Sequence, residues 1–253
     1  MTRMRDFEEL IDEAARADVT GWDFSWLDGR ASEERPPWRY SRLLGEAVAR
    51  ARTAVDLDTG GGEVLAEAPL MAADPHATES WPANAARARE LLGPRGVTVH
   101  ETAPGAPLPF ADASVDLVTA RHPVKPAWSE IARVLAPGGE YLGQHVGPES
   151  AFELIEFFLG ETTAAQRADR RPDLEANAAA EAGLEVTDLR SARLRMEFRD
   201  VGAVVWILRR CVWWVPDFSV ERYRDRLRDM DAHIRRHRSF VAHSTRHLLR
   251  ARR

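Results

Sequence analysis

The sequence predicts an α/β fold whose sheet is mostly parallel and is covered by helices on both faces. Two observations predict it. Segments with strand character and segments with helix character alternate between residues 53 and 145, and no internal repeat is present. The first strand, 53–57, runs directly into a turn that contains Gly60, Gly61 and Gly62. This alternation is typical of parallel strands that are joined by helical crossovers.

The elements of this core follow from apolar spacing and from turn residues. Pro82 lies in the first turn of a predicted helix, where a missing backbone N–H costs nothing. The APGG sequence at 136–139 marks the turn before the last core strand. The predicted strands are 53–57, 75–79, 97–100, 115–120 and 140–145, and the predicted helices are 62–68, 82–92 and 127–134.

The segments on either side of this core are also assigned from their patterns. Apolar residues recur at three- and four-residue spacing near the N-terminus and again after Ser219, which is a favourable helix N-cap. No flexible linker separates any of these segments from the core. The predicted helices are 3–17, 41–52, 150–160, 172–183, 201–214 and one after Ser219, and the predicted strands are 184–198 and 240–252.

Composition excludes several classes of protein. The net charge is −5 and the apolar content is 44%, so nothing global indicates a nucleic-acid or membrane partner. Cys211 is the only cysteine, which excludes an intramolecular disulfide and a zinc site built from several thiolates. The first residues lack the apolar core of a signal peptide, and no stretch is long enough to span a bilayer. We therefore expect a soluble, cytoplasmic protein.

The glycine turn predicts a bound cofactor. Ligands of open parallel sheets lie beyond the carboxyl ends of the strands, and this turn is at such an end. A dinucleotide-binding GxGxxG motif would need glycine at Leu65, which weakens the dehydrogenase interpretation. Asp56 lies at the end of the strand, and Glu79 ends the next strand, where a carboxylate can accept both hydroxyls of a ribose.

Three motifs then resemble one family. They are VDLDTGGGE (55–63), LPFADASVDLV (108–118) and EIARVLAPGGEYL (130–142), and in this order they resemble the class I S-adenosylmethionine-dependent methyltransferases. The resemblance implies a Rossmann-like, doubly wound sheet of seven strands with a reversed hairpin at its end, an aromatic helical insertion before the last strand, and S-adenosylmethionine as cofactor. It implies one domain, comprising an N-terminal helical lid (1–52), a cofactor-binding core (53–147) and a C-terminal half with substrate-side helices and terminal strands (148–253).

The resemblance also assigns cofactor-binding residues. The loop that holds the methionine part corresponds to Asp56, Gly60 and Gly62, and Glu79 corresponds to the acid that binds ribose. Two positions depart from the family pattern. Asp58 stands where glycine is usual, although aspartate tolerates unusual backbone angles, and the acid that often contacts adenine is missing before residue 108. The other residues that we expect near the cofactor are Thr119 and Trp81.

Candidate catalytic and substrate-binding residues come from the same edge and from the flanks. His122 and His145 follow the fourth and fifth core strands, where either can act as a general base or be a purely structural histidine. Arg121 can orient an anionic substrate or form a structural ion pair. Two aromatic segments can close over an apolar or aromatic acceptor, or can simply pack the accessory helices. The aromatic candidates are Trp22, Trp26 and Trp214.

The leading hypothesis is methyl transfer to a small, apolar or aromatic molecule at an O, N or C atom. The arginine-rich segment 219–253 keeps an RNA or protein acceptor open as an alternative, although its arginines are interspersed with acids. A non-catalytic protein that binds the cofactor is a second alternative, and a dehydrogenase is a third. We expect no metal, because no compact group of acids and histidines is evident at a shared strand end. The oligomeric state is left open.

Overall fold

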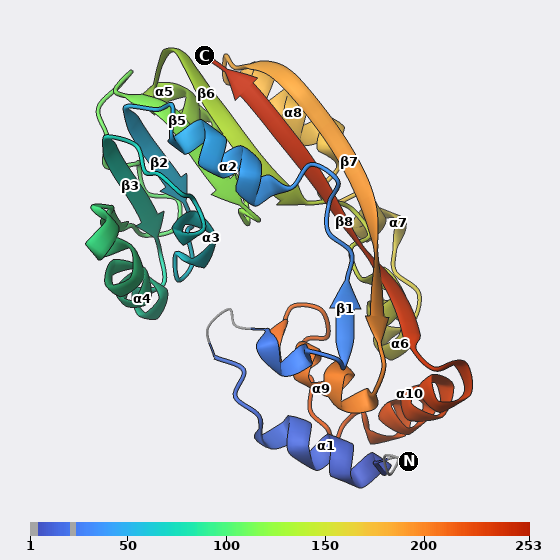
Figure 1. Cartoon of the computed structure of the whole chain (residues 1–253). Helices are drawn as coiled ribbons and strands as arrows, with labels where there is room; N and C mark the ends of the chain where they lie inside the picture. The colour runs from blue at the N-terminus through green and yellow to red at the C-terminus, as the bar shows by residue number, and fades with distance from the viewer. Residues whose placement is uncertain (1–4, 21–23) are drawn as a thin grey trace. The chain divides into compact units, whose positions relative to one another are not determined.

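The computed structural model describes residues 5–20 and 24–253, and it divides the chain into two compact units (Figure 1). The first unit contains Met1–Arg35, Glu149–Asp169 and Arg193–Thr245. The second contains Pro36–Pro148, Arg170–Ala192 and Arg246–Arg253. The long strands β7 (Glu185–Phe198) and β8 (Phe240–Arg252) contribute residues to both units.

The second unit holds the predicted parallel core. Strand β2 pairs in parallel with β3 and β5, β3 with β4, and β5 with β6, whereas β6 pairs antiparallel with β8. The order of the whole sheet is β1-β7-β8-β6-β5-β2-β3-β4. The core strands are β2 (Thr53–Leu57), β3 (Asp74–Glu79), β4 (Thr98–Glu101), β5 (Val115–Arg121) and β6 (Leu135–Val146).

Alternation of side chains along these strands explains why helices cover both faces. Ala54 and Leu117 belong to one apolar cluster, whereas their neighbours Val55 and Val118 belong to another. Successive residues of a strand point to opposite faces, so each face needs its own helical layer. The first cluster includes residues of α2 (Tyr40–Val48) and α4 (Pro82–Leu92), and the second includes residues of α5 (Trp128–Val134) and α8 (Pro172–Glu181).

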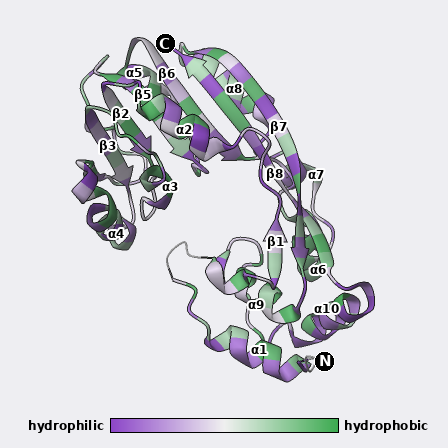
Figure 2. Ribbon diagram, viewed as in Figure 1, coloured by the Kyte–Doolittle hydropathy of each residue, from purple (hydrophilic) through white to green (hydrophobic). Residues whose placement is uncertain are grey.

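The first unit is built around the apolar helix α9 (Val201–Arg210), in which residues 201–208 are all buried. Helix α1 (Phe7–Arg16) begins with a capping box from Asp6 and buries Leu10, Ile11 and Ala14. Figure 2 shows hydrophobic and hydrophilic residues interleaved along α1, as its predicted amphipathic pattern requires. The other elements of the first unit are η1 (Ser25–Leu27), β1 (Ala31–Glu33), α6 (Phe152–Leu159), α7 (Ala164–Arg167) and α10 (Arg224–His237).

The α/β class and the mostly parallel core are confirmed, but the strand number differs. The sheet has eight strands, because β1 pairs antiparallel with β7, with Ala31 opposite Phe198. Only three residues form β1, and they show no apolar alternation, so the sequence carried no signal for it. The single-domain organisation stays a prediction. In the described part of the chain, no helix is both long and apolar enough to cross a membrane.

Several helix boundaries also differ from expectation, among them those of α10 and α3. Helix α10 begins at Arg224 rather than after Ser219, whose hydroxyl instead accepts the N–H of Arg222 at 3.2 Å in the preceding turn. Helix α3 (Glu63–Ala66) is only four residues long, whereas 62–68 was expected. A single turn carries little aligned backbone dipole, so α3 adds little positive charge to the glycine turn.

Candidate active site

The glycine turn follows β2 and changes direction through three left-handed residues, Asp58 (φ 51°), Gly60 (φ 64°) and Gly62 (φ 86°). The expected tolerance of aspartate for this conformation is therefore confirmed at Asp58. Gly62 is required for a second reason, because a Cβ atom there would lie 2.7 Å from Cδ1 of Leu92 on α4. The absence of a side chain at Gly62 thus allows the turn to pack closely against α4.

Glu79 at the end of β3 fixes this turn. One carboxylate oxygen, Oε2, accepts the N–H of Gly60 at 2.7 Å, and the other, Oε1, accepts the N–H groups of Ser80 and Trp81, both at 2.9 Å. A carboxylate offers about four acceptor positions, so one position remains on Oε2. Glu79 can therefore still accept one ribose hydroxyl rather than both, and it also orders the loop that surrounds the ligand.

Two further acids lie beside Glu79. Asp56 is buried, and burial raises its pKa to about 6 even though Thr119 donates a hydrogen bond to it at 2.6 Å and Arg121 acts in the opposite direction. Burial also raises the pKa of Asp58, and the charge of Glu79 adds to this effect. None of these three acids has an ion-pair partner within residues 5–20 and 24–253. The edge of the sheet thus presents clustered carboxylates that form no ion pair among the described residues.

This arrangement tests whether the residues fit the cofactor that the sequence implies. S-adenosylmethionine carries a sulfonium and an ammonium group, and a cationic ligand would favour the ionised forms of Asp56 and Asp58. The anionic pyrophosphate of a dinucleotide would instead be repelled by the same acids. The residues therefore fit an adenosyl sulfonium better than a nicotinamide dinucleotide.

Two other residues that were predicted to contact the cofactor, Trp81 and Thr119, differ in their exposure to solvent. Trp81 is 66% exposed directly after Glu79, so its ring is available for stacking on a base. Thr119 is buried, and its hydroxyl is used in the hydrogen bond to Asp56. Thr119 therefore orients Asp56 in this structure, and its direct contact with a cofactor stays a prediction.

His122 lies at the end of β5 in a left-handed conformation (φ 57°) and is linked to a buried chain of hydrogen bonds. The indole N–H of Trp38 donates to Oε1 of Gln144 at 2.8 Å, which directs the amide nitrogen of Gln144 toward Nε2 of His122 at 3.1 Å. Since the amide nitrogen only donates, Nε2 of His122 accepts and the ring proton resides on Nδ1. Burial and the nearby Arg246 and Arg121 hold the pKa of His122 well below 6.5, in agreement with a neutral ring.

Since Nε2 of His122 is engaged by Gln144, the remaining nitrogen Nδ1 carries the proton and can donate a hydrogen bond. A role of His122 in catalysis stays a prediction. Arg121 precedes His122, is exposed, and forms no ion pair within the described residues. The contact between Gln144 and His122 was not predicted, because only the β5–β6 pairing brings these two residues together.

His145 lies in a different environment. It is 1% exposed, and its Nδ1 lies 2.5 Å from Oε2 of Glu175, which is also 2.9 Å from Nε2 of His247. Burial lowers the pKa of His145. The expectation that acids and histidines are not grouped at a strand end is thus incorrect, since Glu175 and His247 come from distant parts of the chain. A catalytic role for His145 stays a prediction.

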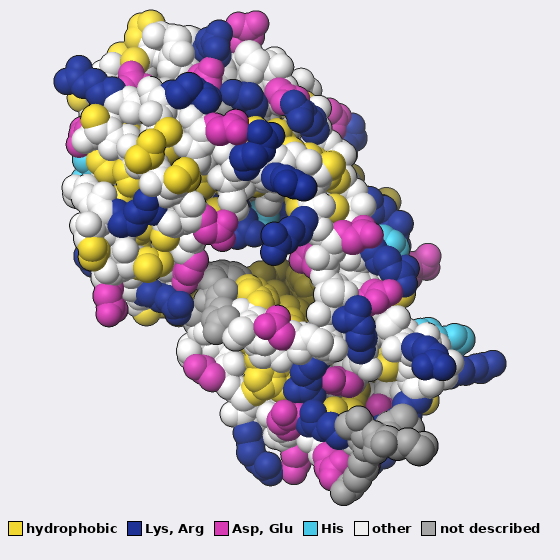
Figure 3. All heavy atoms as spheres, viewed as in Figure 1, with side chains coloured by type: hydrophobic (Ala, Val, Ile, Leu, Met, Phe, Trp, Pro, Cys, Tyr) yellow, Lys and Arg dark blue, Asp and Glu magenta, His cyan; other side chains and the backbone are white. Residues whose placement is uncertain are grey.

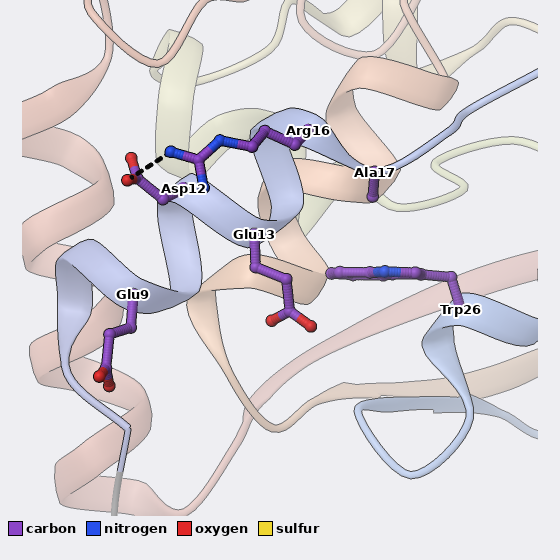
Figure 4. Close-up of a pocket in the computed structure, with 6 residues that line it drawn as sticks. All are labelled: Glu9, Asp12, Glu13, Arg16, Ala17 and Trp26. Carbon is purple, nitrogen blue, oxygen red and sulfur yellow. Dashed lines mark hydrogen bonds and ion pairs between the residues drawn. The ribbon is translucent and has the colours of Figure 1, made fainter.

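Two of the predicted substrate aromatics, Trp26 and Trp214, belong to the first unit. Trp22 lies outside the described residues. Trp26 stacks on Trp206, with ring centroids 5.9 Å apart, and carries the guanidinium of Arg30 at 3.9 Å, while Trp214 is partly buried against the same core. Trp26 also lines a hollow of about 530 Å³ with five residues of or next to α1 (Figure 4). No residue of that hollow comes from the glycine turn, so its substrate role stays a prediction.

Comparisons with known proteins agree with this fold. Residues 55–143 match a family described as a methyltransferase domain. The structure is similar to a candidate methyltransferase from Bacillus halodurans C-125 (TM-score 0.59, 18% identity, 84% of this chain and 97% of that one). It is also similar to the YcgJ protein of Bacillus subtilis (TM-score 0.59, 17% identity, 85% and 97%) and to the [4+2]-cyclase SpnF (TM-score 0.51, 16% identity, 85% and 80%). No curated protein matches the chain in sequence.

Residues 55–143 thus match a methyltransferase domain, and the fold agrees with that of the class I, S-adenosylmethionine-dependent methyltransferases. The cofactor of this class is S-adenosylmethionine, and its activity is methyl transfer. These assignments confirm the resemblance of the three sequence motifs.

The raised pKa of Asp56 predicts a pH-dependent stability. The folded state keeps this proton up to about pH 6, whereas the unfolded state loses it near pH 4, so the free energy of unfolding should fall as pH rises from about 4 to about 6, by roughly 3 kcal/mol from this residue. Asp56→Asn should remove this component while keeping the bond from Thr119. Urea unfolding of both proteins across pH 4–7 measures the difference; parallel curves would show that Asp56 does not titrate as described.

The three hydrogen bonds to Glu79 predict that even an isosteric change is damaging. Glu79→Gln places an amide donor opposite at least one backbone N–H, which should lower the free energy of unfolding by about 1–3 kcal/mol and weaken binding of S-adenosylhomocysteine about ten- to hundredfold. Calorimetric titration with S-adenosylhomocysteine measures the change in binding, and urea unfolding measures the change in stability.

Glu101→Gln is the matched control for stability. Glu101 lies opposite Glu79 in the β3–β4 register, but it is exposed and contacts only the side chain of Arg89, at 3.3 Å. Its substitution should change stability by less than about 0.5 kcal/mol. Equal stability of Glu79→Gln and the unmodified chain would contradict the described role of Glu79.

Proposed function

We propose that this chain transfers the methyl group of S-adenosylmethionine to a small, largely apolar or aromatic molecule that carries an anionic oxygen. The observation that supports the cofactor half of this proposal best is the cluster of Asp56, Asp58 and Glu79, which forms no ion pair within the part of the chain that the structure describes. When bound, the cofactor supplies an activated methyl group on a positively charged sulfur.

The acceptor half of the proposal rests on the end of β5. The exposed guanidinium of Arg121 can pair with an anionic group, and the Nδ1–H of His122 can donate to an oxygen. A carboxylate or phenolate has already lost its proton, so its methylation needs no general base. The contribution of these residues is to hold the nucleophile in line with the methyl group, and positioning of this kind is worth about 7–11 kcal/mol of the barrier.

An RNA acceptor is less well supported. Many arginines of the C-terminal segment are paired with acids: Arg224 and Arg228 with Glu8, and Arg235 with Asp231. Acidic and basic side chains are also interspersed on the face drawn in Figure 3. Paired arginines contribute less to binding of a phosphate backbone, which depends on unneutralised positive charge.

A protein that binds the cofactor without transferring its methyl group is the second candidate. One structural relative is described as a [4+2]-cyclase, so the fold does not by itself determine the reaction. This candidate is separated from the first by the presence or absence of a methylated product.

An assay with methyl-labelled S-adenosylmethionine tests the proposal. The acceptor panel pairs aromatic and aliphatic carboxylic acids and phenols with their neutral amides and methyl ethers, and it includes total RNA. We expect label in the anionic compounds and not in their neutral counterparts. Label in RNA alone would support an RNA methyltransferase, and cofactor binding without any product would support a non-catalytic protein.

Two variants define the roles of the acceptor-side residues. Arg121→Gln should raise KM for the anionic acceptor about tenfold or more, because a charge-assisted hydrogen bond contributes about 1.5–3 kcal/mol, and Arg42→Gln, which alters an exposed arginine paired with Glu46 on α2, should leave KM unchanged. His122→Phe should reduce kcat/KM without changing the slope of its pH profile between pH 6 and 8. A pH-dependent rate that disappears in His122→Phe would instead identify His122 as a base.

A further inference from the structure

Three metal-ligating side chains converge in the second unit, outside the glycine turn. The antiparallel register of β6 and β8 places His145 directly opposite His247, and Glu175 reaches both from α8. One ligating atom from each residue lies within 4.8 Å of the other two. Among the described residues, no other group of three histidines, cysteines or acids is arranged in this way.

The cluster is almost closed to solvent. His145 and His247 are 1% and 0% exposed, and the side chain of Glu175 is 19% exposed. Nδ1 of His145 lies 2.5 Å from Glu175, whereas Nδ1 of His247 is buried and has no hydrogen-bond partner among the described residues. Buried polar atoms are normally satisfied, so the unpartnered nitrogen of His247 needs an explanation.

The surroundings of His145 resemble those of a metal ligand. The hydroxyl of Tyr141 lies 2.9 Å from Nε2 of His145, and the ring of Trp128 stacks on the imidazole with 6.1 Å between centroids. Metal-ligating histidines usually donate their other ring N–H to a neighbouring oxygen, which fixes the tautomer and leaves the ligating nitrogen unprotonated. Tyr141 and Nδ1 of His145 can fill these two roles.

We propose that His145, Glu175 and His247 form a site for a divalent first-row transition metal, with Zn²⁺ as the best match. Two imidazoles and one carboxylate are a donor set that zinc uses with a fourth, non-protein ligand. Ligand atoms around tetrahedral Zn²⁺ lie about 3.3 Å apart, whereas Glu175 Oε2 lies 2.5 and 2.9 Å from the two histidine nitrogens. The two histidine nitrogens therefore need to move away from Oε2 of Glu175 by less than about 1 Å to admit the ion.

The ion would connect three segments of the second unit, because β6, β8 and α8 each supply one ligand. Residues 170–192 and 246–253 join this unit from far along the chain. Binding to the folded state alone raises stability by mass action. The site thus serves to attach α8 to the sheet, and this role does not depend on which acceptor is methylated.

The test uses the full-length chain, stripped with a chelator and titrated with Zn²⁺ by calorimetry, with metal content after dialysis as a second measurement. His233 and His237 lie one turn apart on α10 with ring centroids at 4.6 Å, so all titrations carry His237→Gln to remove this competing pair. We expect one Zn²⁺ per chain and a thermal unfolding midpoint that rises with Zn²⁺ concentration.

Three variants and one control make the result specific. His247→Gln and Glu175→Gln should abolish retention of Zn²⁺ and the rise in unfolding midpoint, and Tyr141→Phe should weaken binding about ten- to hundredfold. His100→Gln is the matched control, because His100 pairs with His76 at 3.1 Å outside this cluster, and it should retain one Zn²⁺ per chain.

The proposal fails if the chain retains no Zn²⁺ after it has been titrated and dialysed. It also fails if the variants and the control retain Zn²⁺ equally. In the first case the cluster is a hydrogen-bonded triad in which both histidines donate to Glu175. Should His247→Gln fail to fold, Tyr141→Phe and Glu175→Gln still decide the outcome, since an unchanged affinity in both would overturn the site.

Discussion

The carboxylate of Glu79 is the contact on which the candidate active site depends. It accepts three backbone N–H groups, one from the glycine turn after β2 and two from the start of α4. A charged acceptor makes stronger hydrogen bonds than a neutral one, so this one side chain holds two loops together at the edge of the sheet. The lack of a side chain at Gly62 completes the arrangement, because it lets the turn approach Leu92.

The cost of this arrangement is electrostatic. Glu79 and Asp58 repel one another, and Asp56 is buried beside them with no ion-pair partner among the described residues. A site of this kind is stabilised by a positively charged ligand, and S-adenosylmethionine provides one. Backbone N–H groups thus occupy most acceptor positions of Glu79. The negative charges of Asp56 and Asp58, in contrast, would be neutralised only when a cationic ligand binds. The same reasoning separates a methyltransferase from a dinucleotide-dependent enzyme on the same kind of sheet.

Much of the fold could be predicted from local patterns, but the contacts between distant segments could not. Strand β2 and helix α4 were predicted with their observed bounds, since alternating apolar residues and Pro82 are strong local signals. Strand β1 was missed because it has only three residues, which lie between polar neighbours and show no alternation of apolar and polar side chains.

The site shows the same division. Asp56, Gly62 and Glu79 were identified because they lie within motifs. The interaction of Gln144 with His122, and the approach of Glu175 and His247 to His145, depend on strand register and helix packing that no single segment encodes. A crystal structure of the chain with S-adenosylmethionine tests this site most directly. We expect the ammonium group beside Asp56 or Asp58 and a ribose hydroxyl on Oε2 of Glu79. A cofactor bound elsewhere, or a glycine turn released from Glu79, would contradict the proposed site.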